Sequence, residues 1–387
     1  MKKVTAISLF VVSFSVLVVL FLTLDFFSET ETGTNGAMKS GSIHAEVPDP
    51  NVPESEPEEI TTTASLMAVG DILIHDYVYN QAAIGNGKYD FTPMFRLVKP
   101  YLESADLTMA NQETMIGGTE IGVSTYPSFN SPFEVGTTLK ESGVDLVTIA
   151  NNHTLDRGEK AIMNALDHWD EIDMAYTGAY RSEVDRADIR LIERNDIHFS
   201  FLSYTYGTNG IPVPESKPYL VNLIDIDLIK SEIDEAKRLS DVVVLSLHFG
   251  NEYERMPNEQ QKLLASEAAE AGADIIIGHH PHVLQPAEWI ENTDGSRTFV
   301  VYSLGNFLSG QRRDYKDIGG IVQIKAKKVV KGDEVTVSLE EPAFIPTWVD
   351  RQYTIQPMFQ LADQQQVYSE IKQHMSQWIP DMQFIEN

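Results

Sequence analysis

Three of the ten histidines in this chain fall within four positions, in the segment Gly278-His279-His280-Pro281-His282. Histidine is the commonest metal ligand in proteins. Three imidazoles this close together would repel one another if they were protonated, whereas a divalent cation would hold them neutral. The chain has no cysteine, so nitrogen and oxygen donors would have to bind the metal. The segment therefore predicts a catalytic or hard-metal site rather than a structural thiolate zinc site.

Other polar residues of the chain also follow apolar, strand-like runs. These runs lie at 65–69, 106–110, 145–150, 242–247 and 273–277. The residues after them that could bind metals or move protons are Asp71, His75, Asn111, Glu113, Asn151, Asn152, His153, His248, Glu252 and His279. Ligands of open α/β sheets bind at the carboxyl ends of the strands. We therefore expect these side chains to meet at one edge of a sheet.

Strand-like and helical segments alternate from residue 61 to about residue 306, which indicates an α/β domain. Helical periodicity occurs at 95–104, 158–172, 225–239 and 257–271, and residues 359–378 are interpreted as a closing helix. The segments 320–325 and 334–339 alternate with period two around Lys331-Gly332-Asp333, which predicts an antiparallel hairpin. The sheet is therefore predicted to be mixed.

The amino-terminal residues predict export. Val4 to Leu24 carries no charge, follows Lys2 and Lys3, and is long enough to span a bilayer. We interpret residues 1–27 as a cytoplasmic stub with an uncleaved transmembrane signal-anchor; a cleaved signal peptide is the alternative. Residues 28–60 are acidic, contain prolines and lack aromatic residues, which predicts a linker. Residues 61–387 are expected to form one extracytoplasmic domain.

Acidic residues outnumber basic ones by 57 to 29, which gives a formal net charge of −28. Such a surface repels nucleic acid, so we expect no nucleic-acid partner. The sequence contains no Gly-x-x-x-x-Gly-Lys-Ser/Thr loop, which excludes a P-loop ATPase. It also contains no Gly-x-Ser-x-Gly elbow and no cysteine nucleophile. Metal-dependent hydrolysis is the chemistry that the remaining residues favour.

A two-metal hydrolytic site needs a bridging carboxylate, further nitrogen and oxygen ligands, and a group that protonates the leaving group. Candidate oxygen ligands are Asp71, Glu113, Asn111 and Asn152. His153 follows one of them and could face the substrate. Two alternatives stay open. Asn151 and Asn152 could simply form a turn, and Glu252 could pair with Arg255 at helical spacing.

Six motifs occur in a fixed order: Gly-Asp71-x-x-x-His75, Asn111-x-Glu113, Asn-Asn152-His153-x-x-Asp156, His248-x-Gly-x-Glu252, Gly278-His-His-Pro-His282 and Ser303-Leu-Gly-Asn306-Phe307. Together they resemble the CapA/PgsA family of bacterial capsule proteins, over about Ser65 to Phe307. The resemblance implies a domain similar to the calcineurin-like metallophosphatases. The fold expected is a four-layer α/β sandwich of two mixed β-sheets flanked by helices, preceded by the transmembrane helix.

The resemblance also implies roles for individual residues. The implied metal ligands are Asp71, His75, Glu113, Asn152, His248, His280 and His282, and the implied catalytic residues are His153 and Asp156. Asn111, Asn151, Arg157, Glu252, His279 and Asn306 are implied as substrate-binding or supporting residues. The expected cofactor is one or two divalent ions of manganese, zinc or iron. Metallophosphatases carry Asp-x-His where this chain has Asp71 and His75, and their Gly-His-x-His fits His280 and His282 better than His279.

The family implies a single-pass protein of the cell membrane that supports poly-γ-glutamate synthesis or export. Its expected partners are membrane-bound ligase subunits, the polymer itself and, through the anchor, membrane lipid. Two other functions stay open. The domain could be an extracytoplasmic metallophosphoesterase that acts on an exported phosphate ester, or a non-catalytic scaffold that holds a structural metal. Whether the chain is an enzyme is therefore left open by the sequence.

Overall fold

The computed structural model describes residues 58–386 of the chain. The predicted signal-anchor and nearly all of the predicted linker lie outside this range. No helix formed by the described residues combines the length and apolar character needed to cross a bilayer. The first strand begins at Glu59, two residues before the expected start of the domain.

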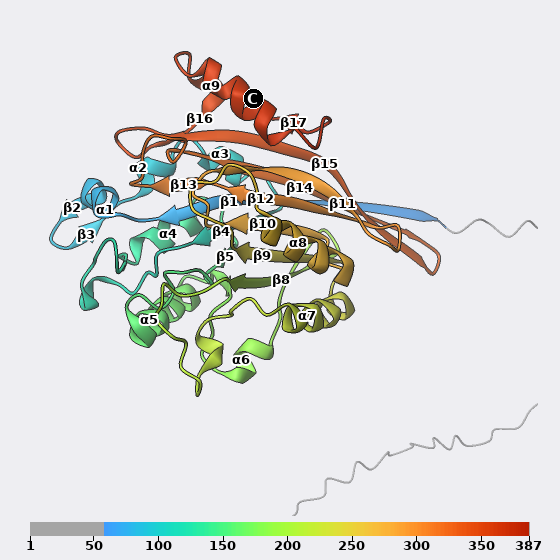
Figure 1. Cartoon of the computed structure of the whole chain (residues 1–387), viewed down its shortest axis with the longest axis horizontal. Helices are drawn as coiled ribbons and strands as arrows, with labels where there is room; N and C mark the ends of the chain where they lie inside the picture. Colours follow the sequence, from blue (N-terminus) through green and yellow to red (C-terminus); the bar gives the residue numbers. More distant parts are fainter. Residues whose placement is uncertain (1–57, 387) are drawn as a thin grey trace, which may run out of the picture. The chain divides into compact units, whose positions relative to one another are not determined.

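The first sheet is mixed, and it contains nine of the strands found within residues 58–386 (Figure 1). Its main path runs β16-β15-β14-β1-β4-β5-β6, with β13 paired to β1 and β17 paired to β15. The strands are β1 (Glu59–Leu73), β4 (Leu107–Gln112), β5 (Leu146–Thr148), β6 (Ala175–Thr177), β13 (Asn306–Ser309), β14 (Ile318–Lys331), β15 (Glu334–Val349), β16 (Ile355–Pro357) and β17 (Gln383–Phe384). β1 lies between its parallel neighbour β4 and its antiparallel neighbour β14.

The second sheet has the strand order β11-β12-β10-β9-β8-β7 and is also mixed. Its strands are β7 (Arg190–Arg194), β8 (Ile197–Thr205), β9 (Val242–His248), β10 (Ile275–His279), β11 (Leu284–Glu291) and β12 (Arg297–Leu304). The four central strands β8, β9, β10 and β12 are parallel, so their carboxyl ends lie at one edge. A short ribbon pairs β2 (Ala83–Gly85) with β3 (Lys88–Tyr89).

The helices occupy the connections between strands. They are α1 (Asp76–Ala82), α2 (Thr92–Phe95), α3 (Lys99–Leu102), α4 (Glu134–Glu141), α5 (Gly158–Glu171), α6 (Glu183–Ala187), α7 (Ile226–Leu239), α8 (Glu259–Ala271) and α9 (Gln365–Met375). Three short 3-10 helices are found in the described chain, η1 (Thr119–Ile121), η2 (Pro218–Leu220) and η3 (Met358–Gln360).

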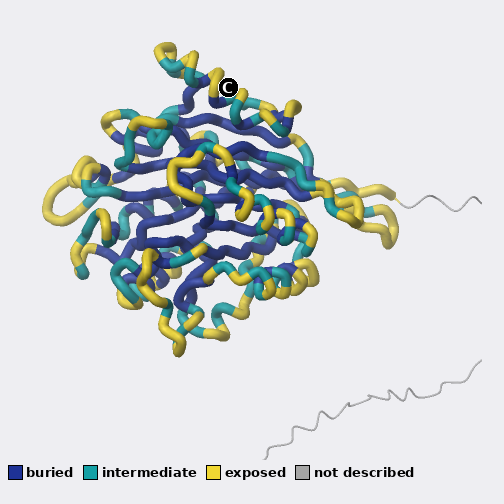
Figure 2. Tube along the Cα trace, in the orientation of Figure 1, coloured by how far each residue is buried: buried dark blue, intermediate teal, exposed yellow. Residues whose placement is uncertain are grey.

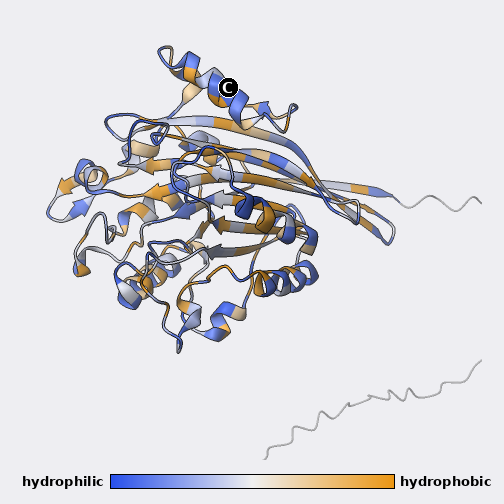
Figure 3. Cartoon of the chain, in the orientation of Figure 1, coloured by the Kyte–Doolittle hydropathy of each residue, from blue (hydrophilic) through white to orange (hydrophobic). Residues whose placement is uncertain are grey.

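Alternation of side chains along β1 shows how the layers stack. Leu66 and Ala68 belong to an apolar core that includes residues of the second sheet, so the two sheets pack face to face. Met67 and Val69 point the other way, into a core shared with α4 and α5. A third core packs the second sheet against α7 and α8. The order of layers is therefore helix, sheet, sheet, helix, with buried, hydrophobic strands in the middle (Figures 2 and 3).

The two mixed sheets and the hairpin around Gly332 agree with the sequence prediction. The predicted helix at 95–104 is wrong, because it is divided into α2 and α3, with Pro100 in the first turn of α3. The predicted helix at 359–378 is shorter, because the backbone first forms η3 and α9 begins only at Gln365. Helix α8 begins after Asn258, whose side chain caps it together with Gln261.

Candidate metal centre

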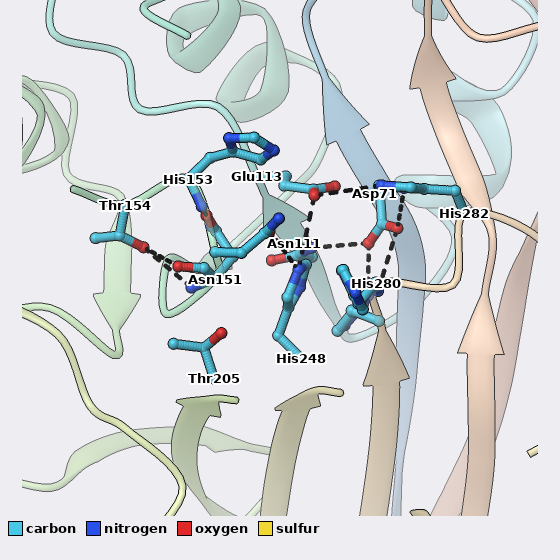
Figure 4. A network of polar contacts seen from close by, with 12 residues as sticks. Asp71, Asn111, Glu113, Asn151, His153, Thr154, Thr205, His248, His280 and His282 are labelled. Atoms are coloured by element: carbon cyan, nitrogen blue, oxygen red, sulfur yellow. Dashed lines mark hydrogen bonds and ion pairs between the residues drawn. The ribbon is translucent and has the colours of Figure 1, made fainter. Parts of the chain in front are cut away.

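The carboxyl ends of strands from both sheets converge on one group of side chains (Figure 4). Asp71 near the end of β1 pairs in register with Asn111 on β4, and Glu113 follows β4 directly. His248 and His279 are paired at the ends of β9 and β10. The two residues that follow the end of β10 by one and three positions, His280 and His282, complete the group. These residues do meet as expected, but at the edges of two sheets rather than at one edge of a single sheet.

Two glycines allow the strands to approach closely enough. A Cβ atom on Gly70 would lie 2.0 Å from the carbonyl oxygen of Gly305, and one on Gly278 would lie 2.0 Å from that of Tyr302. No side chain fits at such distances. His280 and His282 have positive φ angles of 96° and 58°, which non-glycine residues rarely adopt. Such backbone strain is typical of functional sites, where surrounding packing holds it in place.

Asp71 is completely buried and is surrounded by donors. Asn111 donates from Nδ2 to its Oδ1 at 2.8 Å, and His282 Nδ1 lies 3.2 Å from its Oδ2. His279 Nδ1 lies 3.3 Å from Oδ1. Burial alone would raise the pKa of Asp71, but the contacts with His279 and His282 together hold that pKa well below its usual range. Asp71 is therefore a carboxylate that is ionised in the folded protein.

Glu113 lies at the centre of the group, and neither of its buried carboxylate oxygens has a hydrogen-bond partner among the described residues. Its Oε1 is 3.6 Å from His248 Nε2 and 3.7 Å from His282 Nε2. Burial raises the pKa of Glu113 well above its usual range. An unsatisfied buried carboxylate is costly, and a cation would remove that cost.

Asn152, His248 and His280 form a second part of the same group. His248 Nε2 lies 2.8 Å from Asn152 Oδ1, and the rings of His248 and His280 are 4.9 Å apart. Burial lowers the pKa of His248 well below its usual range and lowers that of His280 to about 3. Both imidazoles are therefore neutral at pH 7, which is the form that binds metals.

These donors fit a divalent cation. Donor atoms of Glu113, His280 and His282 all lie within 4.8 Å of one another. Several buried donor atoms at the centre have no hydrogen-bond partner in residues 58–386: both Glu113 oxygens, both His279 nitrogens, His248 Nδ1 and His280 Nδ1. His248 Nε2 and His282 Nε2 both lie beside Glu113 Oε1, so Glu113 would hold one or two cations together with these rings.

A second polar pair lies beside this group. His153 Nδ1 is 2.7 Å from Asp156 Oδ2, which also accepts a hydrogen bond from the Phe129 backbone N–H at 2.8 Å. Asn151 Oδ1 accepts from the His153 backbone N–H at 2.9 Å, and its Nδ2 donates to Gln112 at 3.1 Å. The loop after β5 is thereby anchored to β4, with the His153 ring near Glu113 (Figure 4). A histidine oriented by a carboxylate is suited to transfer a proton.

Two predicted site residues are directed elsewhere. His75 is the N-cap residue of α1, and its Nδ1 is 3.1 Å from Leu73 O and accepts from the Gly310 N–H at 3.2 Å. His75 is not among the residues whose donor atoms cluster with Glu113, so its role as a ligand stays a prediction. Arg157 donates to Ile121 O, Gly122 O and Ser124 Oγ, so its guanidinium holds the 121–124 segment and is not directed at a substrate.

The remaining predicted residues are close to the centre. Asn306 pairs in register with Asp71 and has a buried Oδ1 without a partner in the described chain. The proposed pair between Glu252 and Arg255 is wrong, because Arg255 binds Glu370 at 2.8 Å. Glu252 lines a hollow of about 360 Å³ together with Asn152, His153 and Asp156. Asn151 and Asn152 do lie in a turn, but their side chains also make the contacts described above.

Two residues of the site were missed by the sequence reasoning. Asn209 Oδ1 accepts from Asn152 Nδ2 at 3.3 Å, and its Nδ2 lies 3.3 Å from His153 Nδ1. The Tyr206 ring is 4.7 Å from that of His280. Both residues belong to the irregular segment after β8, where Asn209-Gly210 predicts only a turn. No feature of their sequence indicates that this segment reaches the other sheet.

A family model described as "Bacterial capsule synthesis protein PGA_cap" matches residues 65–311, which include every predicted site residue. The chain is 30% identical over 270 residues to the capsule biosynthesis protein CapA of Bacillus anthracis; the match covers 67% of this chain and 62% of that protein. It is 29% identical over 268 residues to the PGA biosynthesis protein CapA of Bacillus subtilis (strain 168), 67% of each. The matched region is thus less than two thirds of the Bacillus anthracis relative.

Solved structures are similar only at low identity. The sulfate thiohydrolase SoxB from Thermus thermophilus is 14% identical, with a TM-score of 0.40, over 80% of this chain and 60% of that one. A hypothetical protein, also from Thermus thermophilus, is 13% identical, with a TM-score of 0.40, over 71% of this chain and 98% of that one.

Proposed function

Because the chain belongs to the PGA_cap family of bacterial capsule synthesis proteins, we propose that it supports poly-γ-glutamate production through a metal-dependent hydrolytic site. The observation that carries the proposal is Glu113, a buried carboxylate without hydrogen-bond partners in the described range, beside the imidazoles of His248 and His282. A purely structural polar cluster would satisfy its carboxylate with protein hydrogen bonds. Glu113 instead leaves both oxygens for a ligand.

The residues divide into two roles. Asp71, Glu113, Asn152, His248, His280 and His282 would hold one or two divalent cations of manganese, zinc or iron. When bound, the cation supplies Lewis acidity that polarises the oxygen of the bond under attack. These nitrogen and oxygen donors suit all three of those metals.

The His153–Asp156 pair would move the proton. Asp156 accepts from Nδ1, so the other ring nitrogen, Nε2, is free to exchange a proton with the leaving group. Asp156 keeps the ring in this tautomer and orientation, since its Oδ2 is itself fixed by the Phe129 N–H. For an amide bond of the polymer, water would attack the carbonyl carbon while the C–N bond breaks, and the protonated ring of His153 would donate from Nε2 to the departing nitrogen, which leaves a free amine and a new carboxylate.

The cellular setting belongs to the same proposal. We expect Val4–Leu24 to anchor the chain in the membrane, with residues 1–3 in the cytoplasm and the domain outside. In that position the domain would meet the polymer where membrane-bound ligase subunits deliver it. The net charge of −28 would repel an anionic polymer, so we expect contact to be limited to a cation-loaded site.

A metallophosphoesterase is the second candidate, because two-metal sites that share a carboxylate also serve phosphate esters. The full-length chain, loaded with manganese or zinc and given an aryl phosphate ester, distinguishes the two. Turnover that is lost in Glu113→Gln and His153→Asn would favour the phosphoesterase.

Complementation tests the capsule function. A strain lacking the chain would receive the wild-type chain, Glu113→Gln, His153→Asn or His198→Asn, and the length and amount of exported polymer would be measured on gels. His198 is a half-exposed histidine at the start of β8 and serves as the matched control. We expect the first two variants to fail and His198→Asn to behave as wild type. Normal polymer from the strain without the chain would refute the function, whereas failure of Glu113→Gln alone would favour a scaffold.

A further inference from the structure

The hollow beside His153 has an unusual charge. Its lining includes the carboxylates of Glu252 and Asp156 and the amides of Asn152 and Asn209, but no lysine or arginine. Arg157 is the nearest arginine in sequence, and three acceptors of the 121–124 segment occupy its guanidinium. A ligand group that enters this hollow therefore meets the Glu252 carboxylate, neutral amides and the His153 ring, with no lysine or arginine among them.

Glu252 is the acid that remains available there. It is exposed, and within residues 58–386 it forms no ion pair with a basic side chain. Asp156, by contrast, is buried and holds His153. Glu252 is thus an accessible anion at the mouth of the centre.

One exposed aromatic ring lines the same hollow. Tyr126 is exposed and belongs to the lining together with Glu252. Tyr206 and Tyr253 do not line it, and Lys316 Nζ already lies over the Tyr253 ring at 4.9 Å. Tyrosine rings attract cations through their faces. A carboxylate that shares a hollow with an exposed tyrosine ring is suited to recognise an ammonium group.

We propose that this hollow binds a primary ammonium group of the substrate and that Glu252 selects it. The inference rests on the proposed function, in which the substrate is a chain of glutamates. Such a chain has a single cationic group, its terminal ammonium, and every interior residue adds a carboxylate that Glu252 repels. Glu252 would therefore direct the site to the amino-terminal end of the polymer rather than to its interior.

Binding without turnover tests the inference. Thermophoresis of the full-length, manganese-loaded chain would compare three γ-linked pentaglutamates that carry a dye at the carboxyl end. One has a free amino terminus, one is acetylated, and one is acetylated but has lysine as its second residue. An ion pair and cation–π contacts at an exposed site predict that the free peptide binds about tenfold more tightly than the acetylated one. The preference should weaken at high salt.

Glu252→Gln should remove the preference, and Glu254→Gln is the matched control, because Glu254 is exposed in the same loop but does not line the hollow. Tight binding of the lysine peptide would support ammonium recognition while assigning it to a side chain. Equal binding of free and acetylated peptides, no binding of any peptide, or a preference that survives Glu252→Gln would overturn the inference. None of these outcomes depends on hydrolysis or capsule formation, so a failure here is distinct from a failure of the proposed function.

Discussion

Metal binding should release protons from His282 and from Glu113, whose pKa is raised by burial. Burial alone would lower the pKa of this imidazole, but the charges of Glu113 and Asp71 and the hydrogen bond with Asp71 raise it to about 9. A metal binds only the neutral ring, so the cation must displace that proton at pH 7. With a pKa about two units above pH 7, only about 1% of the rings are neutral, and the apparent affinity is about 100-fold below its limit.

The affinity should therefore rise about tenfold for each pH unit between pH 6.5 and 8.5. Calorimetric titration of the metal-free, full-length chain with manganese measures this directly. Repeating it at pH 7 in buffers of different ionisation enthalpy gives the number of protons released, which should be at least one. Glu113→Gln removes one of the two charges that raise the pKa of His282, so fewer protons should be released.

The same shift affects stability with a defined sign. The pKa of His282 is higher in the folded protein than in the unfolded chain. Its stabilising contribution to the free energy of unfolding of the metal-free protein is therefore complete below about pH 6.5 and is lost as the pH rises toward about 9. His198 is half-exposed and lies at the start of β8, whereas the donor group lies at the carboxyl ends of the strands. His198→Asn should therefore change neither the number of protons released nor the manganese affinity. A manganese affinity that stays constant from pH 6.5 to 8.5, with no proton released, would refute the coupling between Glu113 and His282.

Two further predictions concern the fold. Gly278→Ala should lower the unfolding free energy by about 3 kcal/mol or more, because its Cβ would overlap Tyr302 O; Gly207→Ala, with open space around it, should be neutral in the same thermal unfolding assay. Burial raises the pKa of Asp274 to about 6, so the free energy of unfolding of the wild type falls as the pH rises from about 4 to 6. Asp274→Asn should therefore stabilise the protein at pH 7 by up to about 3 kcal/mol. Denaturant unfolding at pH 4 and pH 7 checks it, and an equal effect at both pH values would contradict the assignment.

The donors at strand ends could be predicted because their signal is local. Asp71, Glu113, His248 and His280 each follow an apolar run, and parallel strands of one sheet end at the same edge. What the sequence could not show is how two separate sheets align their edges. That alignment depends on the packing of Leu66 and Ala68 against the second sheet, which no spacing along the chain encodes.

The contacts of other predicted residues could not be foreseen either. His75 Nδ1 lies beside Leu73 O and the Gly310 N–H, and its role as a ligand stays a prediction. Arg157 supports the 121–124 segment, whose acceptors lie more than 30 positions earlier in the chain. Asn209 was missed because its role comes from a loop that crosses to the other sheet. Contacts between distant, irregular segments leave no period or motif in the sequence.

The donors of the centre come from both halves of the sandwich. Asp71, Glu113 and Asn152 belong to strands and loops of the first sheet, whereas His248 and His282 belong to the second. An ion bound by residues of both sheets would cross-link the two layers. Chelation would then do more than abolish hydrolysis. It would weaken the packing between the two sheets and expose the interior to proteases. In a metal-poor medium, the amount of intact protein would follow the supply of the ion.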